Sequence, residues 1–197
     1  QVIATGGSHM PSELIKKVYD KLGCKFFNVF GMSEGPCTQT RLQDSDEAVF
    51  HTVGRPICPY DEFKVIDTDG RDLPRGTEGE LVVRGPCIFR GYFKADAENQ
   101  EAFTADGFFR TGDIAKFDPE GRLIITGRKK DIIIRGGENI SAREVEELIL
   151  SHPNVEQVAV VGMPDPVLGE KVCAFIKPKR GMGVSFDQII SFLREKK

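Results

Sequence analysis

The spacing of apolar residues changes twice along these 197 residues, near residue 50 and near residue 131. In the first part, Val2–Thr5 is a short apolar run that ends in two glycines, and residues 11–22 follow a helical period. Lys25–Phe30 is a second apolar run, and a glycine follows it. A strand, a helix and a strand joined by short connections predict an α/β remnant over residues 1–49.

The middle part, residues 50–129, alternates short apolar segments with turn signals. Asp-Gly and Glu-Gly dipeptides separate the segments, and Asp-Gly is a frequent hairpin turn. This pattern is typical of an antiparallel barrel or sandwich, and we expect a β-rich barrel subdomain. The candidate strands are Glu62–Asp67, Glu80–Arg84, Ile114–Phe117 and Arg122–Thr126.

The last part, residues 130–197, mixes strand and helix signals and predicts a small α+β domain. Two Ser-x-x-Glu/Gln patterns, beginning at Ser141 and Ser185, predict the starts of two helices. A strand is expected at Ile132–Arg135, and two more are expected between the helices, at Val155–Gly162 and Lys171–Lys177.

Composition excludes several classes of protein. The formal charge of −3, from 27 basic and 30 acidic residues, lacks the basic excess of a nucleic-acid binder. The apolar runs are too short to cross a membrane, so we expect no membrane partner. Five cysteines without a C-x-x-C pair argue against a disulfide framework and a structural zinc site, and favour reduced thiols in the cytoplasm. Without a signal peptide or an initial Met, the chain is expected to be part of a longer protein.

Four clusters of glycine and polar residues are candidates for chemistry. The first follows a strand, so its backbone N–H groups, Ser33 and Glu34 would lie at the carboxyl edge of a sheet, where α/β proteins bind ligands. In the second, the carboxylate of Asp113 could bind two neighbouring hydroxyls. The third offers three cations to a polyphosphate, and the paired glycines of the fourth allow close approach of another group. The clusters are Phe30–Gly35, Phe109–Asp113, Gly127–Asp131 and Arg135–Asn139.

Each cluster taken alone also has an ordinary structural explanation, as a strand end, a polar hairpin, a solvated turn or a turn before a capped helix. The chain contains no nucleophile elbow, no dinucleotide-binding glycine motif and no Walker phosphate loop. Any catalysis is therefore expected to depend on electrostatic stabilisation of a phosphorylated species rather than on a covalent protein nucleophile.

The order and spacing of the four clusters resemble those of the adenylate-forming enzymes, which include acyl- and aryl-CoA ligases, aryl-acid–AMP ligases and peptide-synthetase adenylation domains. The resemblance extends over essentially the whole chain. It implies that residues 1–129 are the C-terminal part of the large AMP-binding domain and that residues 130–197 are a truncated, mobile C-terminal domain.

This resemblance implies roles for individual residues of the large domain. Phe30 would stack on adenine, Ser33 would contact the α-phosphate, and Glu34 would hold Mg²⁺ on the ATP phosphates. Asp113 would bind the two ribose hydroxyls. Gly6 and Gly7 resemble the glycine turn that borders the acid pocket and the adenine site.

Three further roles lie near or within the small domain. Arg128 would contact ribose or phosphate, and with Glu34 it is the candidate catalytic pair. Lys130 falls at the hinge about which the small domain turns between the two half-reactions. Gly137 falls where the tunnel for the pantetheine thiol forms.

The implied activity is an ATP-dependent carboxylic acid ligase that makes an acyl- or aryl-adenylate and transfers the acyl group to a thiol. Two elements of that machinery are missing from these residues, the lysine-containing phosphate loop and a catalytic lysine in a P-x-x-x-x-G-K pattern, so the 197 residues alone are expected to be inactive. The substrates would be ATP with Mg²⁺, a small carboxylic acid and coenzyme A, or a carrier protein's phosphopantetheine. A second copy of the chain, in a homodimer, is a further candidate partner.

Different segments of the chain suggest different acids. The sequence from Phe30 to Gly35, together with Cys58–Glu62 and Arg84–Lys94, resembles 2,3-dihydroxybenzoate–AMP ligases. The segment Gly136–Glu146 is more similar to short- and medium-chain acyl-CoA ligases. Two alternatives to an active ligase are a catalytically dead nucleotide-binding module of the same fold and a purely structural domain.

Overall fold

The computed structural model describes residues 1–7, 10 and 12–196. The described chain forms two compact units, Gln1–Ile125 and Thr126–Lys197, and each is considered by itself. The division falls within strand β8 (Leu123–Arg128), close to the expected change of domain. The assignment of residues 1–129 and 130–197 to a large and a small domain stays a prediction.

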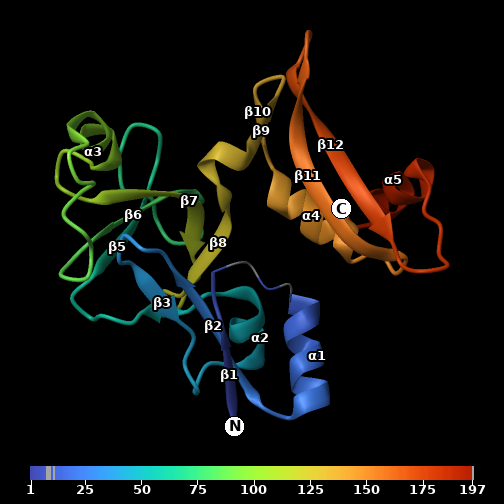
Figure 1. Ribbon diagram of the computed structural model, residues 1–197, viewed down its shortest axis with the longest axis horizontal. Coiled ribbons are helices and arrows are strands. Elements are labelled where there is room, and N and C mark those ends of the chain that lie inside the picture. The colour runs from blue at the N-terminus through green and yellow to red at the C-terminus, as the bar shows by residue number, and fades with distance from the viewer. Residues whose placement is uncertain (8–9, 11, 197) are drawn as a thin grey trace. The chain divides into compact units, whose positions relative to one another are not determined.

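The first unit begins with a mixed sheet whose strand order is β1-β2-β3-β4 (Figure 1). β1 and β2 run parallel, and the helix α1 connects them, as the periodicity predicts. Pro11, with which the predicted helix begins, lies outside the described residues. The elements of this region are β1 (Val2–Thr5), α1 (Ser12–Leu22), β2 (Lys25–Gly31), β3 (Cys37–Gln39), α2 (Asp46–His51) and β4 (Arg55–Pro56).

Buried polar side chains hold β2 to the segments that follow it. The Asn28 side chain donates to the Thr52 carbonyl at 3.0 Å, and the Asn28 backbone N–H donates to the Thr40 hydroxyl at 3.0 Å. The Thr38 hydroxyl donates to the Val53 carbonyl at 2.8 Å. Because buried polar groups need such partners, this network fixes the end of β2, where the first glycine cluster begins.

The second sheet of this unit has the order β5-β6-β7-β8, and the β5–β6 and β6–β7 pairs are antiparallel. The barrel that we expected over residues 50–129 is wrong for the described residues, because this sheet is open and has β5 and β8 at its edges. Barrels filled by side chains have about eight strands, and four cannot enclose a packed interior. Besides β8, the elements of this region are β5 (Glu62–Ile66), β6 (Gly79–Arg84), α3 (Asp96–Ala102) and β7 (Phe109–Phe117).

A hydrophobic core lies against this sheet and joins it to the end of β2. Fully buried side chains of β5 to β8 form its centre, and Phe30 and Met32 pack against them. The first glycine cluster is therefore anchored on the same core as β7. The central residues are Val65, Leu81, Val83, Phe109, Ala115 and Leu123.

The second unit is an α+β arrangement with a sheet of order β10-β9-β12-β11. Ser141 caps α4 by accepting from the Glu144 N–H, and Ser185 and Gln188 form a reciprocal capping box at α5. Helix residues Ile149 and Ile189 are buried with Ile133 and Val160 of the sheet. The elements are η1 (Lys129–Asp131), β9 (Ile132–Arg135), β10 (Glu138–Ser141), α4 (Ala142–Leu150), β11 (Val155–Asp165), β12 (Gly169–Pro178) and α5 (Phe186–Glu195).

None of the helices in the described part of the chain combines the length and the apolar character that crossing a membrane requires.

Candidate functional site

The first glycine cluster forms a tight turn at the end of β2. Gly35 N–H donates to the Met32 carbonyl at 3.1 Å, and Met32 N–H donates to the Pro36 carbonyl at 3.3 Å. The turn leaves Ser33 exposed and Glu34 half-buried. A hydroxyl and a carboxylate thus follow directly after a strand, as the sequence predicted.

A segment far away in the sequence closes over this turn. The Phe89 N–H donates to the Glu34 carbonyl at 2.8 Å, and the Tyr92 hydroxyl donates to Glu34 Oε1 at 3.0 Å. Partial burial, and then the hydrogen bond and the charge of Glu34, raise the pKa of Tyr92. Tyr92 therefore stays protonated and orients the Glu34 carboxylate.

Gly6 lies next to the same strand. A Cβ at Gly6 would come within 3.1 Å of the Val29 carbonyl oxygen, so this position admits the close approach of β1 to β2. Gly7 has φ +87°, a backbone angle that residues with a side chain rarely adopt. Phe30 is half-buried and packs against the core of the second sheet. Its stacking on adenine stays a prediction.

Asp113 lies in a bulge of β7. Glu80 pairs with Ile114 and Val82 pairs with Arg110, so the three residues of Thr111–Asp113 lie opposite a single residue of β6. Gly112 has φ +72°, and the Thr111 hydroxyl donates to the Leu81 carbonyl at 2.9 Å. This hydroxyl also accepts from the Asp113 N–H at 3.1 Å.

The bulge places a carboxylate in a shielded position. Asp113 is only 2% exposed, whereas the neighbouring Arg110 forms an ion pair with Glu80 at 2.6 Å. That pair neutralises the one cation of the cluster within the sheet. Low local polarity strengthens any hydrogen bond that a ligand hydroxyl donates to such a carboxylate.

The remaining predicted residues belong to the second unit or to the strand that leads into it. Arg128 ends β8, and Lys130 lies in the short helix η1, and both side chains are exposed. Gly137, with φ +89°, occupies the turn between β9 and β10, and a Cβ there would meet no atom within 4 Å. Their roles stay predictions.

Sequence reasoning missed two partnerships that shape this site. Tyr92 is separated from Glu34 by 58 positions, and Glu80 is separated from Arg110 by 30. The sequence around Tyr92 resembled aryl-acid ligases, but nothing local indicated which carboxylate it would contact. Only the packing of the segment on the turn after β2 brings these groups together.

Comparisons with known proteins identify the family of this chain. The family described as AMP-binding enzyme matches residues 1–93, and the AMP-binding enzyme C-terminal domain matches residues 144–196. The chain is 48% identical over 180 residues to pyochelin synthase PchD of Pseudomonas aeruginosa, covering 91% of this chain and 33% of that protein. It is 44% identical over 196 residues to 2,3-dihydroxybenzoate-AMP ligase of Bacillus subtilis, covering 100% of this chain and 36% of that protein.

A solved structure gives the same result at the level of the fold. ATP-bound MatB from Rhodopseudomonas palustris matches with a TM-score of 0.93 and 31% identity, over 100% of this chain and 39% of that one. The chain thus spans about a third of the length of the curated relatives described here. Matches of both family domains in sequence order, together with these identities, place the chain in the AMP-binding, adenylate-forming enzyme superfamily.

Proposed function

We propose that the protein carrying this chain is an ATP-dependent carboxylic acid ligase. The observation that carries the proposal is the buried carboxylate of Asp113, presented on a glycine-containing bulge of β7 in a member of the AMP-binding superfamily. A shielded carboxylate suits the recognition of two neighbouring hydroxyls, such as those of a ribose.

The proposed reaction has two steps. An oxygen of the substrate carboxylate attacks the α-phosphorus of ATP, and the bond to pyrophosphate breaks, which gives an acyl-adenylate. The sulfur of a thiol then attacks the acyl carbon, the thiol proton is lost, and AMP leaves. Both steps need groups that hold the reactants in line and stabilise negative charge on the phosphate.

This chain supplies several such groups. The exposed Ser33 hydroxyl is suited to donating to the α-phosphate, and the Arg128 guanidinium is suited to contacting ribose or phosphate. Asp113 would hold the ribose, while Gly6, Gly7 and Phe30 would border the nucleotide. These roles rest on the match between the motifs and the family.

The Glu34 carboxylate fits the requirements of Mg²⁺, which prefers hard oxygen ligands and commonly takes one or two carboxylates plus substrate phosphates. Glu34 Oε1 accepts one hydrogen bond, from Tyr92, and a carboxylate has about four lone-pair sites, so it retains capacity for a cation. When bound, Mg²⁺ would offset the charge of the phosphates. Tyr92 would keep Glu34 turned toward that position.

We propose an aromatic acid as the substrate. The support is the similarity to an enzyme named 2,3-dihydroxybenzoate-AMP ligase, at 44% identity over the whole chain. The thiol is proposed to be coenzyme A, with the phosphopantetheine of a carrier protein as the alternative. Gly137, whose surroundings are open, is the residue of this chain proposed to border the thiol.

Acid-dependent ATP–pyrophosphate exchange by the full-length protein tests the proposal. We expect exchange with salicylate or 2,3-dihydroxybenzoate and much slower exchange with butyrate or hexanoate. Glu34→Gln should lower the exchange rate, whereas Glu98→Gln, at an exposed position of α3, should not. ATP binding without exchange by any acid would instead identify a catalytically dead nucleotide-binding module.

A further inference from the structure

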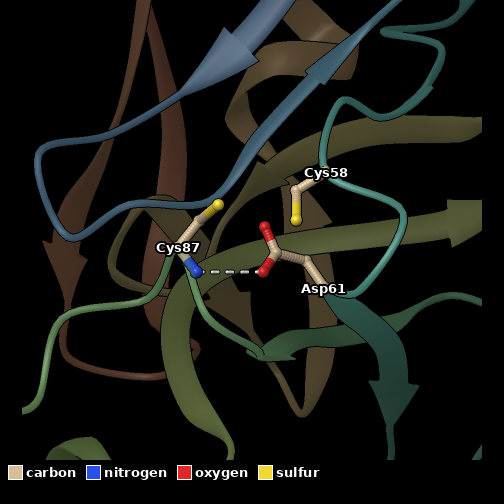
Figure 2. A group of neighbouring side chains, drawn as sticks. All are labelled: Cys58, Asp61 and Cys87. Carbon is tan, nitrogen blue, oxygen red and sulfur yellow. Dashed lines mark hydrogen bonds between the residues drawn. The ribbon is translucent and has the colours of Figure 1, made fainter.

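Two turns of the first unit bring together three side chains of the kinds that bind metal ions, and none of the three belongs to the proposed nucleotide site (Figure 2). The first turn is Cys58–Asp61, in which the Asp61 N–H donates to the Cys58 carbonyl at 3.3 Å. A turn closed in this way places its first and fourth side chains on one side. Figure 2 shows the Cys58 sulfur and the Asp61 carboxylate facing the same small volume.

The second turn, Gly85–Ile88, supplies the third group. The Ile88 N–H donates to the Gly85 carbonyl at 3.2 Å, and Cys87 projects from the turn toward the other two side chains (Figure 2). The Cys87 N–H donates to Asp61 Oδ1 at 3.2 Å. A Cβ at Gly85 would lie 2.2 Å from that same oxygen, so the two turns fit together only because residue 85 is glycine.

The geometry suits a soft divalent cation. One ligand atom from each of Cys58, Asp61 and Cys87 lies within 4.8 Å of the other two. Zinc binds sulfur at about 2.3 Å, so two sulfurs of a tetrahedral site lie about 3.8 Å apart. Ordinary side-chain rotation is therefore enough to close the ligands on an ion, and the two interlocked turns already hold the backbone in place.

The electrostatics also favour a cation. Asp61 is only 8% exposed, whereas Cys87 is exposed and gives solvent a route to the group. A bound cation would offset the charge of this shielded carboxylate and stabilise the two cysteines as thiolates.

We propose that Cys58 Sγ, the Asp61 carboxylate and Cys87 Sγ form a site for Zn²⁺ or a cation of similar softness, with water as the fourth ligand. Binding releases the thiol protons to solvent and changes no oxidation state. Three protein ligands and an open position distinguish this site from the four-ligand structural zinc site that the cysteine spacing argued against. The ligands escaped sequence reasoning because one is a carboxylate in a C-x-x-D pattern and Cys87 lies 26 positions beyond it.

The site adjoins the turn that carries Glu34. A Cβ at Gly35 would lie 1.9 Å from the Cys87 carbonyl oxygen, so the two backbones are in direct contact there. Two residues further on, the Phe89 N–H donates to the Glu34 carbonyl. Metal binding at Cys87 would therefore restrain the segment that closes over Glu34.

Titration of the reduced, metal-free full-length protein with Zn²⁺ against a chromophoric chelator tests the site, with Co²⁺ as a spectroscopic substitute. We expect one high-affinity equivalent and a thiolate-to-cobalt charge-transfer absorption. Cys87→Ser, Cys58→Ser and Asp61→Asn should each weaken Zn²⁺ binding at least roughly 10-fold, because losing even an outer-shell partner of a metal ligand costs about that much. Cys173→Ser, which changes a thiol of β12 in the other unit, should leave the affinity unchanged.

The exposed position of Cys87 makes Cys87→Ser the variant least able to disturb the fold, and circular dichroism checks this. The proposal is overturned if Co²⁺ shows no sulfur charge-transfer band, or if Cys87→Ser binds Zn²⁺ as tightly as the parent protein. Slower amide exchange at Phe89 in the zinc-bound protein would support the restraint on the Glu34 turn, and unchanged exchange there would refute that restraint.

Discussion

Asp113 depends on its immediate neighbours for its position. Gly112 adopts φ +72°, and the Thr111 hydroxyl bridges the Leu81 carbonyl and the Asp113 N–H, so the chain bulges between two regular pairs of the sheet. A side chain at residue 112 would be strained in this backbone conformation. The T-G-D sequence is thus a local device for presenting one buried carboxylate.

Replacing Asp113 with Ala should weaken ATP binding by the full-length enzyme. The loss of a charge-assisted hydrogen bond costs about 1.5–3 kcal/mol, or roughly 10–150-fold in affinity. Calorimetric titration with ATP measures the effect, and Asp72→Ala, at an exposed carboxylate of the same unit, is the matched control. A folded Asp113→Ala protein with the parent affinity would remove Asp113 from the nucleotide site.

Asp118 and Arg122 form a second local pair, at the turn between β7 and β8. Burial alone would raise the pKa of Asp118, but the backbone N–H and the guanidinium of Arg122 outweigh it and lower this pKa below its ordinary value of 3.8. The folded state therefore gains stability from ionised Asp118. This gain is complete above pH 3.8 and disappears as the pH falls through the folded-state value.

Asp118→Asn should accordingly lower the free energy of unfolding at neutral pH by about 1.5–3 kcal/mol, the range for hydrogen bonds to charged groups. The difference from the parent protein should shrink below pH 3.8. Urea denaturation over a pH series measures the loss of stability at neutral pH and its decrease in acid. Asp69→Asn removes an exposed pair with Arg71 and should cost less than about 1 kcal/mol at any pH, so an equal loss in both variants would contradict the special role of Asp118.

The turn after β2 and the Gly85–Tyr92 segment behave as one interlocked element. Gly35 has φ +116°, and its missing side chain leaves room for the Cys87 carbonyl oxygen. The Phe89 N–H and the Tyr92 hydroxyl add hydrogen bonds to Glu34. The position of Glu34 thus depends on a backbone contact that any side chain at residue 35 would push apart.

Gly35→Ala should destabilise the first unit by roughly 2–5 kcal/mol, from about 1–2 kcal/mol of backbone strain plus about 1–3 kcal/mol of overpacking. Gly107→Ala is the control, because Gly107 also has positive φ, +84°, but open space around it, so only the strain applies. Urea denaturation of the two variants separates these contributions. Equal stability of the two proteins would mean that the contact with Cys87 is not tight in solution.

The β9–β10 hairpin turns through two residues with positive φ, Gly136 at +59° and Gly137 at +89°. Arg135 and Glu138 pair across this turn, as a two-residue type I′ loop requires. The fold therefore explains both glycines without reference to a ligand. A functional role for Gly137 needs a test that holds this backbone strain constant.

Gly137→Leu provides that test when it is compared with Gly181→Leu. Both glycines have positive φ, and a Cβ at either one would meet no atom within 4 Å, so the strain is matched. If Gly137 borders the thiol, Gly137→Leu should slow acyl transfer to coenzyme A but leave acyl-adenylate formation near the parent rate. Single-turnover assays of each step measure this, and equal behaviour of the two variants would count against the tunnel.

At the level of the whole protein, the chain divides within β8, and Lys130 follows that strand in η1. Its side chain is exposed and takes no part in the hydrophobic cores of the described residues. A hinge requires such a position, because a few residues must absorb the rotation of one unit.

Lys130→Pro should therefore slow thiol transfer strongly and adenylation less in the full-length enzyme, because proline fixes φ near −65° and removes a backbone donor. Lys130→Ala removes the charge but leaves the backbone free, and it should affect both steps little. Separate measurements of acyl-AMP formation and of acyl transfer to coenzyme A test whether Lys130 is a hinge. A similar loss in both steps, or effects of Lys130→Ala as large as those of Lys130→Pro, would indicate a surface cation rather than a hinge.

The sequence by itself determined the local structure and the family. Apolar spacing predicted β1, β2, β5, β6, β9, β11 and β12 and the capped helices of the second unit, because side-chain periodicity and capping act over a few residues. It missed short elements with weak patterns, such as α3 and β10, and β7 begins earlier than expected, at Phe109. The motif that ends in Asp113 was recognisable because the bulge is built from consecutive residues.

Only the tertiary structure shows that the second sheet stays open and which partners the key side chains contact. Nothing in the strand pattern distinguished an open sheet from a barrel, because closure depends on how many strands pair and not on the alternation within each one. Tyr92 meets Glu34 across 58 positions, and Cys87 meets Asp61 across 26. Such contacts arise when whole segments pack, so the orientation of Glu34 and the grouping of Cys58, Asp61 and Cys87 become visible only in the folded chain.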